Sequence, residues 1–156
     1  MKLNILPEQV QELNKFMDSV RGQEDALIPC IHEAQRIFKG VPIEVQKMIA
    51  ESNSVSVTKV SGIVSFYDYF TSEIQGENII EVCIGTSCYV NEANAILDKV
   101  CEMTKCKPNG TTKDKKYSVI IGRCLGKCEL APSIIINHKS HTAVTMEQVV
   151  KLVEEL

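Results

Sequence analysis

Four of the seven cysteines stand in two close pairs, Cys83 with Cys88 and Cys124 with Cys128. Each pair occupies a glycine-containing loop that directly follows an apolar, strand-like run, residues 78–82 before the first pair and residues 117–121 before the second. Two parallel strands that end at the same edge of a sheet would bring the four thiols together. Four convergent thiolates form a soft ligand set that selects an iron–sulfur cluster, zinc or copper(I) over hard cations.

The placement of these cysteines favours an iron–sulfur cluster and leaves a closed zinc site or a set of redox thiols as alternatives. A [2Fe-2S] cluster needs four thiolates, two for each iron, in loops whose backbone N–H groups can approach the sulfurs. Gly85 and Gly126 permit a close approach because they carry no Cβ, and Arg123 and Lys127 would offset part of the cluster's negative charge. Zinc tolerates similar spacings, but a domain of this size has its own core and needs no zinc to fold. There is no Cys-x-x-Cys, the usual thioredoxin dithiol.

The remaining cysteines and the histidines are predicted to be structural. Cys101 and Cys106 fall at the end of a predicted helix and in the loop after it, with no strand before them and no glycine between them. Packing or surface thiols are expected there, with a redox-active pair as the alternative. Cys30 is expected to act as a small buried hydrophobic residue. The three histidines are dispersed and none has a partner at metal-binding spacing: His32, His138 and His141.

Composition excludes several classes of function. The 156 residues are 44% hydrophobic and 24% charged, as in ordinary globular proteins. The net charge of −3, without a basic cluster, argues against nucleic-acid or membrane-surface binding, and no apolar run reaches the roughly 18 residues that span a bilayer. Residues 1–8 lack the features of a signal peptide. The sequence therefore predicts a cytoplasmic protein whose cysteines bind metal rather than form disulfides.

Residues 1–72 are predicted to form a helical domain, because apolar side chains recur there at helical spacing. Ser56 is a candidate N-cap for the last of its helices, and the polar residues 71–77 are expected to form a linker. The four apolar stripes are Val10, Leu13, Met17 and Val20; Leu27, Ile31, Ala34 and Phe38; Val45, Met48 and Ile49; and Val57, Val60, Val64 and Tyr67.

Residues 76–156 are predicted to form an α/β domain with the order β-α-β-β-β-α, a thioredoxin-like layout. Thr145 and Gln148 make a capping box for the final helix. The other expected elements are strands at 78–83, 117–121, 134–136 and 141–144 and a helix at 90–103. The fold class is thus α+β, an N-terminal helical bundle followed by a thioredoxin-like α/β domain.

The two cysteine loops are similar to those of a known family. Residues 82–89 read VCIGTSCY and residues 122–132 read GRCLGKCELAP. Both resemble the cluster loops of the thioredoxin-like [2Fe-2S] ferredoxin family, in the branch found in the small NADH-dehydrogenase subunit of respiratory complex I. Residues 62–67, with Phe70, are similar to that branch's segment before the first strand. The sequence of the first loop, GTSCY at residues 85–89, is more similar to that of homologous subunits of NAD-dependent, electron-bifurcating hydrogenases and formate dehydrogenases than to that of respiratory complex I.

The resemblance implies that Cys83 and Cys88 ligate one iron of a [2Fe-2S] cluster and that Cys124 and Cys128 ligate the other. It further implies an electron-transfer subunit of an NAD(H)-linked oxidoreductase complex that is not catalytic alone. The chain has no Gly-x-Gly-x-x-Gly dinucleotide fingerprint, so FMN and NAD are expected on a partner flavoprotein subunit, alongside further iron–sulfur subunits.

Three alternatives remain: the same subunit in respiratory NADH:quinone oxidoreductase, a zinc-stabilised adaptor domain without a redox role, and a free-standing ferredoxin or redox sensor. The aromatic cluster Phe66, Tyr67, Tyr69 and Phe70 is expected to help dock the flavoprotein subunit, with core packing as the alternative.

Overall fold

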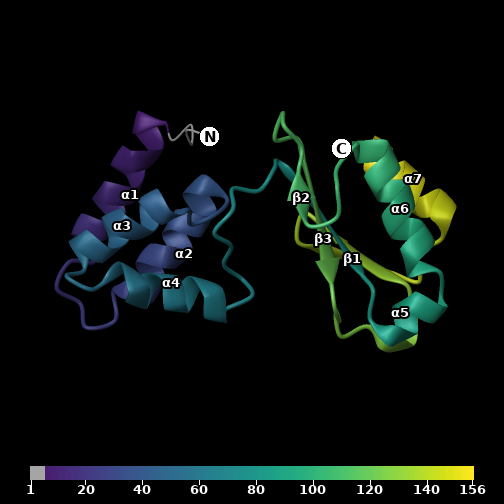
Figure 1. Cartoon of the computed structure of the whole chain (residues 1–156), viewed down its shortest axis with the longest axis horizontal. Coiled ribbons are helices and arrows are strands. Elements are labelled where there is room, and N and C mark those ends of the chain that lie inside the picture. The colour runs from purple at the N-terminus through teal and green to yellow at the C-terminus, as the bar shows by residue number, and fades with distance from the viewer. Residues whose placement is uncertain (1–5) are drawn as a thin grey trace. The chain divides into compact units, whose positions relative to one another are not determined.

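The structure, a computed structural model, describes residues 6–156. Residues 1–5, which belong to the predicted helical domain and to the N-terminal segment that lacks signal-peptide features, lie outside the described residues. Figure 1 shows its helices and strands. Contacts divide the chain into two compact units, which we call the helical unit, ending at Ile74, and the α/β unit, running from Gln75 to Leu156. Among the described residues, no helix is both long enough and apolar enough to cross a bilayer.

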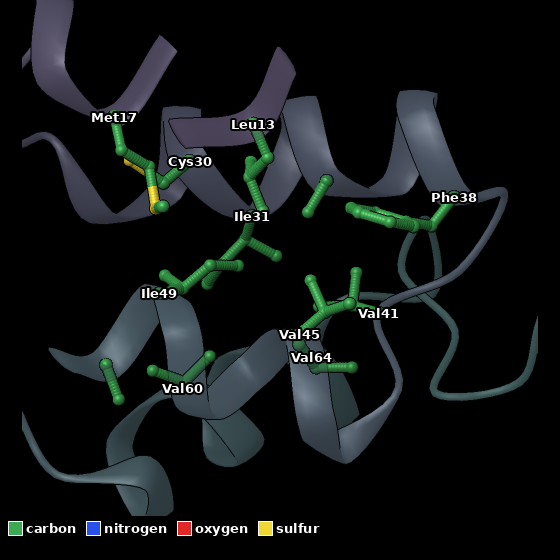
Figure 2. Packing of buried hydrophobic residues seen from close by; sticks show 12 residues of the cluster. Leu13, Met17, Cys30, Ile31, Phe38, Val41, Val45, Ile49, Val60 and Val64 are labelled. Atoms are coloured by element: carbon green, nitrogen blue, oxygen red, sulfur yellow. The ribbon is translucent and has the colours of Figure 1, made fainter. Parts of the chain in front are cut away.

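The helical unit consists of four helices around one apolar core. Ser56 caps the last helix as predicted, since its side chain accepts a hydrogen bond from the N–H of Lys59. The helices are α1 (Pro7–Ser19), α2 (Leu27–Phe38), α3 (Ile43–Ser52) and α4 (Val57–Phe66). Figure 2 shows how their apolar stripes meet. The core contains Leu13, Met17, Cys30, Ile31, Ala34, Phe38, Val41, Val45, Ile49, Ala50, Val60 and Val64. Tyr67, the last member of the fourth predicted stripe, instead follows α4 and is exposed.

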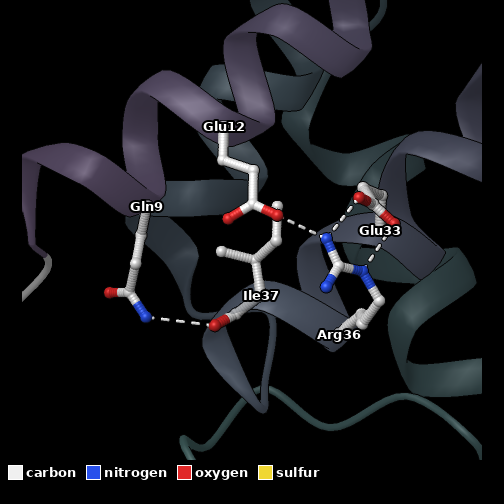
Figure 3. A network of polar contacts seen from close by, with 5 residues as sticks. All are labelled: Gln9, Glu12, Glu33, Arg36 and Ile37. Atoms are coloured by element: carbon white, nitrogen blue, oxygen red, sulfur yellow. Dashed lines mark hydrogen bonds and ion pairs between the residues drawn. The ribbon is translucent and has the colours of Figure 1, made fainter.

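Polar contacts at the surface join α1 to α2 (Figure 3). The guanidinium of Arg36 on α2 pairs with Glu12 on α1 and with Glu33 one turn earlier on its own helix. The side chain of Gln9 donates a hydrogen bond of 3.0 Å to the carbonyl of Ile37. Because the ion pairs are largely solvent-exposed, they contribute less to stability than the buried core beneath them.

Hydrogen bonds hold the segment between α4 and the first strand near both of its ends. In the helical unit the N–H of Val41 donates to the carbonyl of Thr71 at 2.7 Å, and the Thr71 N–H donates to the side chain of the buried Gln35. In the α/β unit the Gly76 N–H donates to the Ser118 hydroxyl at 2.7 Å. Most of the predicted linker is therefore held within one unit or the other.

The α/β unit is a five-stranded sheet with its two longer helices on one face (Figure 1). The strand order is β2-β3-β1-β4-β5; β1 and β3 are parallel, and the other pairs are antiparallel. Alternate residues such as Ile80 and Val82 on β1 and Val119 on β3 face a core that includes side chains of both helices. The elements are β1 (Asn78–Cys83), α5 (Thr86–Val90), α6 (Ala93–Thr104), β2 (Gly110–Thr111), β3 (Tyr117–Gly122), the 3₁₀ turn η1 (Cys128–Leu130), β4 (Ser133–Ile136), β5 (Lys139–Thr142) and α7 (Met146–Glu154).

This architecture confirms the predicted fold class and most of its elements, including the capping box of Thr145 and Gln148. The single helix predicted at 90–103 is wrong. Two helices, α5 and α6, replace it because Glu92 adopts a left-handed conformation with φ of 63° and turns the chain between them. The last predicted strand is also displaced, since β5 ends at Thr142, Ala143 has a φ of 48° and Val144 enters the core. The short strand β2 lies in a segment predicted to be a loop.

Candidate iron–sulfur cluster site

The two cysteine loops leave the same edge of the sheet. Strands β1 and β3 run in parallel, and their register places Cys83 directly opposite Gly122. The ladder continues one residue further, because the N–H of Ile84 donates to the carbonyl of Gly122 at 2.8 Å. The loop with Cys83 and Cys88 therefore begins beside the loop with Cys124 and Cys128, as the sequence pattern predicted.

The first cysteine pair is buried. Cys83 ends β1 and Cys88 lies within α5, and each side chain is only 2% exposed. Burial raises the pKa of the Cys88 thiol, and the neighbouring Cys83 raises it further. A negative charge on Cys128 has the same effect on Cys88, so the second pair lies close enough to interact with the first.

The second pair lies at the surface. Cys124 and Cys128 are exposed, and their sulfur atoms are 3.8 Å apart. The N–H of Gly126 points at the Cys124 sulfur at 3.4 Å. The Cys124 thiol, as a hydrogen-bonding and charged neighbour, raises the pKa of Cys128. Because metals bind the thiolate, loading of this site releases protons and is favoured by higher pH.

The sulfur geometry fits a centre that binds thiolates in pairs. Two thiolates on one tetrahedral metal with metal–sulfur bonds of about 2.3 Å lie about 3.8 Å apart, as Cys124 and Cys128 do. Within residues 6–156, no three His, Cys, Asp or Glu side chains lie close enough together to hold one ion. Cys124 and Cys128 thus have the spacing of two thiolates on one metal, and a [2Fe-2S] cluster takes two thiolates on each iron.

Direct contacts hold the two loops together. The hydroxyl of Ser87, on α5, donates a hydrogen bond of 2.9 Å to the carbonyl of Cys128. Gly85 lies so close to the second loop that a Cβ at this position would come within 2.5 Å of the Arg123 carbonyl oxygen. No sequence pattern indicated the role of Ser87, because a serine in a loop is common and its partner is distant along the chain.

The two loop glycines serve different purposes. Gly85 permits a close approach to the backbone of the other loop, a contact that was not predicted, while its predicted approach to the cluster stays a prediction. At Gly126 a Cβ would meet no protein atom within 4 Å, so the close approach predicted there, toward the cluster, stays a prediction. Gly126 is needed for its backbone conformation, with φ of 74°, which strains residues that carry a Cβ. Arg123 and Lys127 are both exposed in this loop.

Glu81 is a further charged group near the site that sequence reasoning did not single out. It lies on β1 between Ile120 and Ile135 of the adjacent strands, and its carboxyl is close to Gly122. Burial raises the pKa of this carboxyl. The signal in the sequence was a lone acidic residue within an otherwise apolar strand.

The other candidate residues lie away from these loops. Cys106 is buried in the core of the α/β unit with its sulfur 3.2 Å from the Gly110 carbonyl oxygen, and Cys101 packs against the same core. Cys30 is buried in the core of the helical unit, as predicted, and burial raises its pKa.

The histidines are dispersed, as expected from the sequence. The ring of His32 stacks on Tyr69 with a centroid distance of 5.0 Å. His138 lies in the turn between β4 and β5, and His141 lies on β5.

Comparison with known proteins gives the site a context. Residues 13–156 match the family described as thioredoxin-like [2Fe-2S] ferredoxin. The chain is 36% identical to the NADP-reducing hydrogenase subunit HndA of Solidesulfovibrio fructosivorans, over 97% of this chain and 89% of that protein. It is 29% identical to a subunit of the NADH-quinone oxidoreductase of Aquifex aeolicus, over 84% of this chain and 82% of that protein.

A solved structure shares the fold. The crystal structure of an NAD⁺-reducing [NiFe]-hydrogenase in the H₂-reduced state superposes with a TM-score of 0.71 at 18% identity. The match covers 83% of this chain but only 22% of that chain, so this chain corresponds to one part of a longer polypeptide.

The contact at Gly85 yields a test of how the loops are held together. We expect Gly85→Ala to lower the free energy of unfolding by about 1–3 kcal/mol, the usual cost of overpacking, and to reduce the iron content of the purified protein. The cost is steric alone, because the φ of Gly85, −61°, is open to any residue.

The control is Gly62→Ala on α4, where a Cβ would meet nothing within 4 Å and alanine favours the helix. Denaturant unfolding and iron analysis would measure both variants. Equal iron content and stability in Gly85→Ala and the unchanged protein would show that the close approach of the loops is unimportant.

Proposed function

The chain belongs to the thioredoxin-like [2Fe-2S] ferredoxin family, and on that basis we propose that it is an electron-transfer subunit of an NAD(H)-linked, flavin-containing oxidoreductase complex. The observation that carries the proposal is the meeting of two cysteine pairs at the ends of the parallel strands β1 and β3. The chain holds an electron and passes it on, and it is not catalytic alone.

Within this proposal, Cys83 and Cys88 hold one iron and Cys124 and Cys128 hold the other. The cluster supplies one-electron chemistry when bound. The chain's own residues bind and shield it: the first pair is buried at the end of β1 and within α5, while Gly126 directs an N–H at the sulfur of Cys124. With four thiolates the cluster carries a charge of roughly −2, or −3 when reduced, and the cations of Arg123 and Lys127 offset part of it.

Hydride chemistry at the nicotinamide belongs to a partner subunit. A hydride carries two electrons, and a [2Fe-2S] cluster accepts one of them at a time, so a flavin must separate the pair. The sequence offers no dinucleotide fingerprint, and we therefore place FMN and NAD on a flavoprotein subunit of the complex, next to further iron–sulfur subunits. The proposal places the chain in the cytoplasm, where thiols stay reduced.

An electron-bifurcating, NAD-dependent hydrogenase is the proposed parent complex. Identity to the hydrogenase subunit HndA, at 36%, is higher than identity to the Aquifex aeolicus NADH-quinone oxidoreductase protein, at 29%, and covers more of the chain. The sequence Gly-Thr-Ser-Cys-Tyr around Cys88 supports the same choice. A formate dehydrogenase and respiratory NADH:quinone oxidoreductase are the alternative parents.

The helical unit is proposed to dock the flavoprotein subunit. Three aromatic side chains near the end of α4 are exposed, Phe66 at 77%, Tyr67 at 47% and Tyr69 at 55%. They form a continuous series of ring contacts with Phe70, which packs against the core. Exposed, ordered aromatics are a common anchor of protein interfaces.

Cysteine substitutions test the proposed ligands. We expect Cys83→Ser, Cys88→Ser, Cys124→Ser and Cys128→Ser each to lower iron content several-fold, because each replaces a soft thiolate with a harder oxygen ligand. Cys101→Ser is the matched control, half-buried but away from the loops, and should keep its iron. Iron and sulfide analysis with visible absorption would measure this, and loss of iron in Cys101→Ser equal to that in Cys83→Ser would refute the assignment.

Truncation tests whether the α/β unit binds the cluster by itself and whether the helical unit docks the flavoprotein subunit. A chain of residues 73–156 contains all four proposed ligands and the complete sheet, so we expect it to keep the visible spectrum of the cluster. It should fail to co-purify with the flavoprotein subunit and fail to be reduced by NADH through it. Full binding and a full rate of reduction in the truncated chain would show that the helical unit is not the docking element.

A further inference from the structure

The four proposed ligands differ sharply in their access to solvent. Cys83 and Cys88 are each 2% exposed, whereas Cys124 and Cys128 lie at the surface. An electron that reaches a cluster held by these residues therefore has its shortest route through the Cys124 and Cys128 side. A donor must approach this side of the α/β unit.

Three exposed apolar side chains of the α/β unit lie on the two elements that carry Cys88 and Cys128. In the α/β unit the large hydrophobic residues that are exposed are Tyr89 at 58%, Val90 at 73%, Leu130 at 46% and Met146 at 37%. The first two lie on α5, which also carries Cys88, and Leu130 lies on η1, which begins at Cys128. Exposed apolar residues that cluster beside a functional site typically mark an interaction surface.

The two elements that carry these residues form one surface. Helix α5 contacts η1 directly, and the hydrogen bond from Ser87 to the Cys128 carbonyl fixes them to each other. The side chain of Asn91 closes the end of α5 by donating to the Ser87 carbonyl at 2.7 Å. A partner that docks here meets a surface that is already ordered.

Charge indicates what kind of partner fits. Arg123 and Lys127 are exposed on either side of Cys124, and neither takes part in the ion pairs found within residues 6–156. Glu129 on η1 is the acidic residue next to Cys128. The two cations would attract a partner with acidic residues at the rim of its interface and would speed its approach.

We propose that Tyr89, Val90 and Leu130, flanked by Arg123 and Lys127, form an electron-exchange patch that receives an apolar, acid-rimmed face of the flavin-bearing subunit. The inference rests on the proposed function and deepens it, because it assigns the side of the cluster at which the electron enters. In the step itself, the reduced flavin loses one electron and one ferric ion of the cluster becomes ferrous. The helical unit anchors the partner elsewhere, and this patch brings the donor to the exposed thiolate pair.

A paired substitution tests the patch. Val90→Asp with Leu130→Asp, in the full-length chain with its cluster, removes the apolar centre and adds charge that repels an acidic rim. The matched control is Met146→Asp, at an exposed apolar residue on α7 of the same unit. The first measurement is the second-order rate at which an NADH-reduced flavoprotein subunit, purified apart from this chain, bleaches the cluster's visible absorption. The second is the dissociation constant of the complex that this subunit forms with the cluster-free chain.

We expect reduction of the double variant to be slower by about tenfold or more, and its binding to be correspondingly weaker. The control should remain within about twofold of the unchanged chain. Arg123→Gln should flatten the dependence of the rate on salt, because it removes a steering charge. Visible spectrum and the extent of reduction by dithionite should be the same in all variants, which excludes damage to the cluster.

The possible outcomes distinguish failure of the electron-exchange patch from failure of the proposed function. If the unchanged chain neither binds the flavoprotein subunit nor is reduced by it, the proposed function fails and the patch fails with it. If the unchanged chain is reduced, and the double variant matches it in rate and affinity, the function stands and the patch is refuted. A double variant that loses its visible spectrum would show that these residues hold the cluster loops in place, which also contradicts the proposal.

Discussion

The parallel pairing of β1 with β3 is the constraint on which the rest of the α/β unit depends. It places Cys83 opposite Gly122 and directs both cysteine loops away from the same edge of the sheet. An antiparallel pairing would send the loops to opposite edges and separate the thiols. Because parallel neighbours require a crossover, the chain passes through α5 and α6 between them, and α6 covers the sheet that the two strands form.

Short-range contacts hold the two cysteine loops against each other and leave little room for larger side chains between them. Gly85 lies against the Arg123 carbonyl, and Ser87 is bonded to the Cys128 carbonyl. One cysteine pair is buried in a small cluster with Ala93, and the other pair is exposed. The first pair anchors the site to the core, while the second faces the exterior, where an electron donor can approach. Under the proposed ligand assignment, the cluster would be shielded on the side of the first pair and accessible on the side of the second.

Sequence reasoning predicted the features that depend on local patterns. The strand before each cysteine pair, the capping box at Thr145 and the N-cap at Ser56 all lie where expected, because each depends on residues close together in the chain. The turn at Glu92 could not be predicted. Glutamate rarely adopts the left-handed backbone conformation that glycine favours, so no local sequence signal indicates it. The link from Ser87 to Cys128 joins residues 41 positions apart, and the role of Gly126 depends on a backbone angle that its sequence neighbours do not specify.

The central claim is that the two thiol pairs hold one binuclear cluster, and electron paramagnetic resonance on the full-length chain tests it most directly. Protein purified without oxygen should contain about two irons and two sulfides per chain. After reduction it should show a rhombic or near-axial signal of total spin one-half, since one ferrous and one ferric ion couple antiferromagnetically. Stoichiometric zinc, a colourless protein and no signal after reduction would contradict the claim.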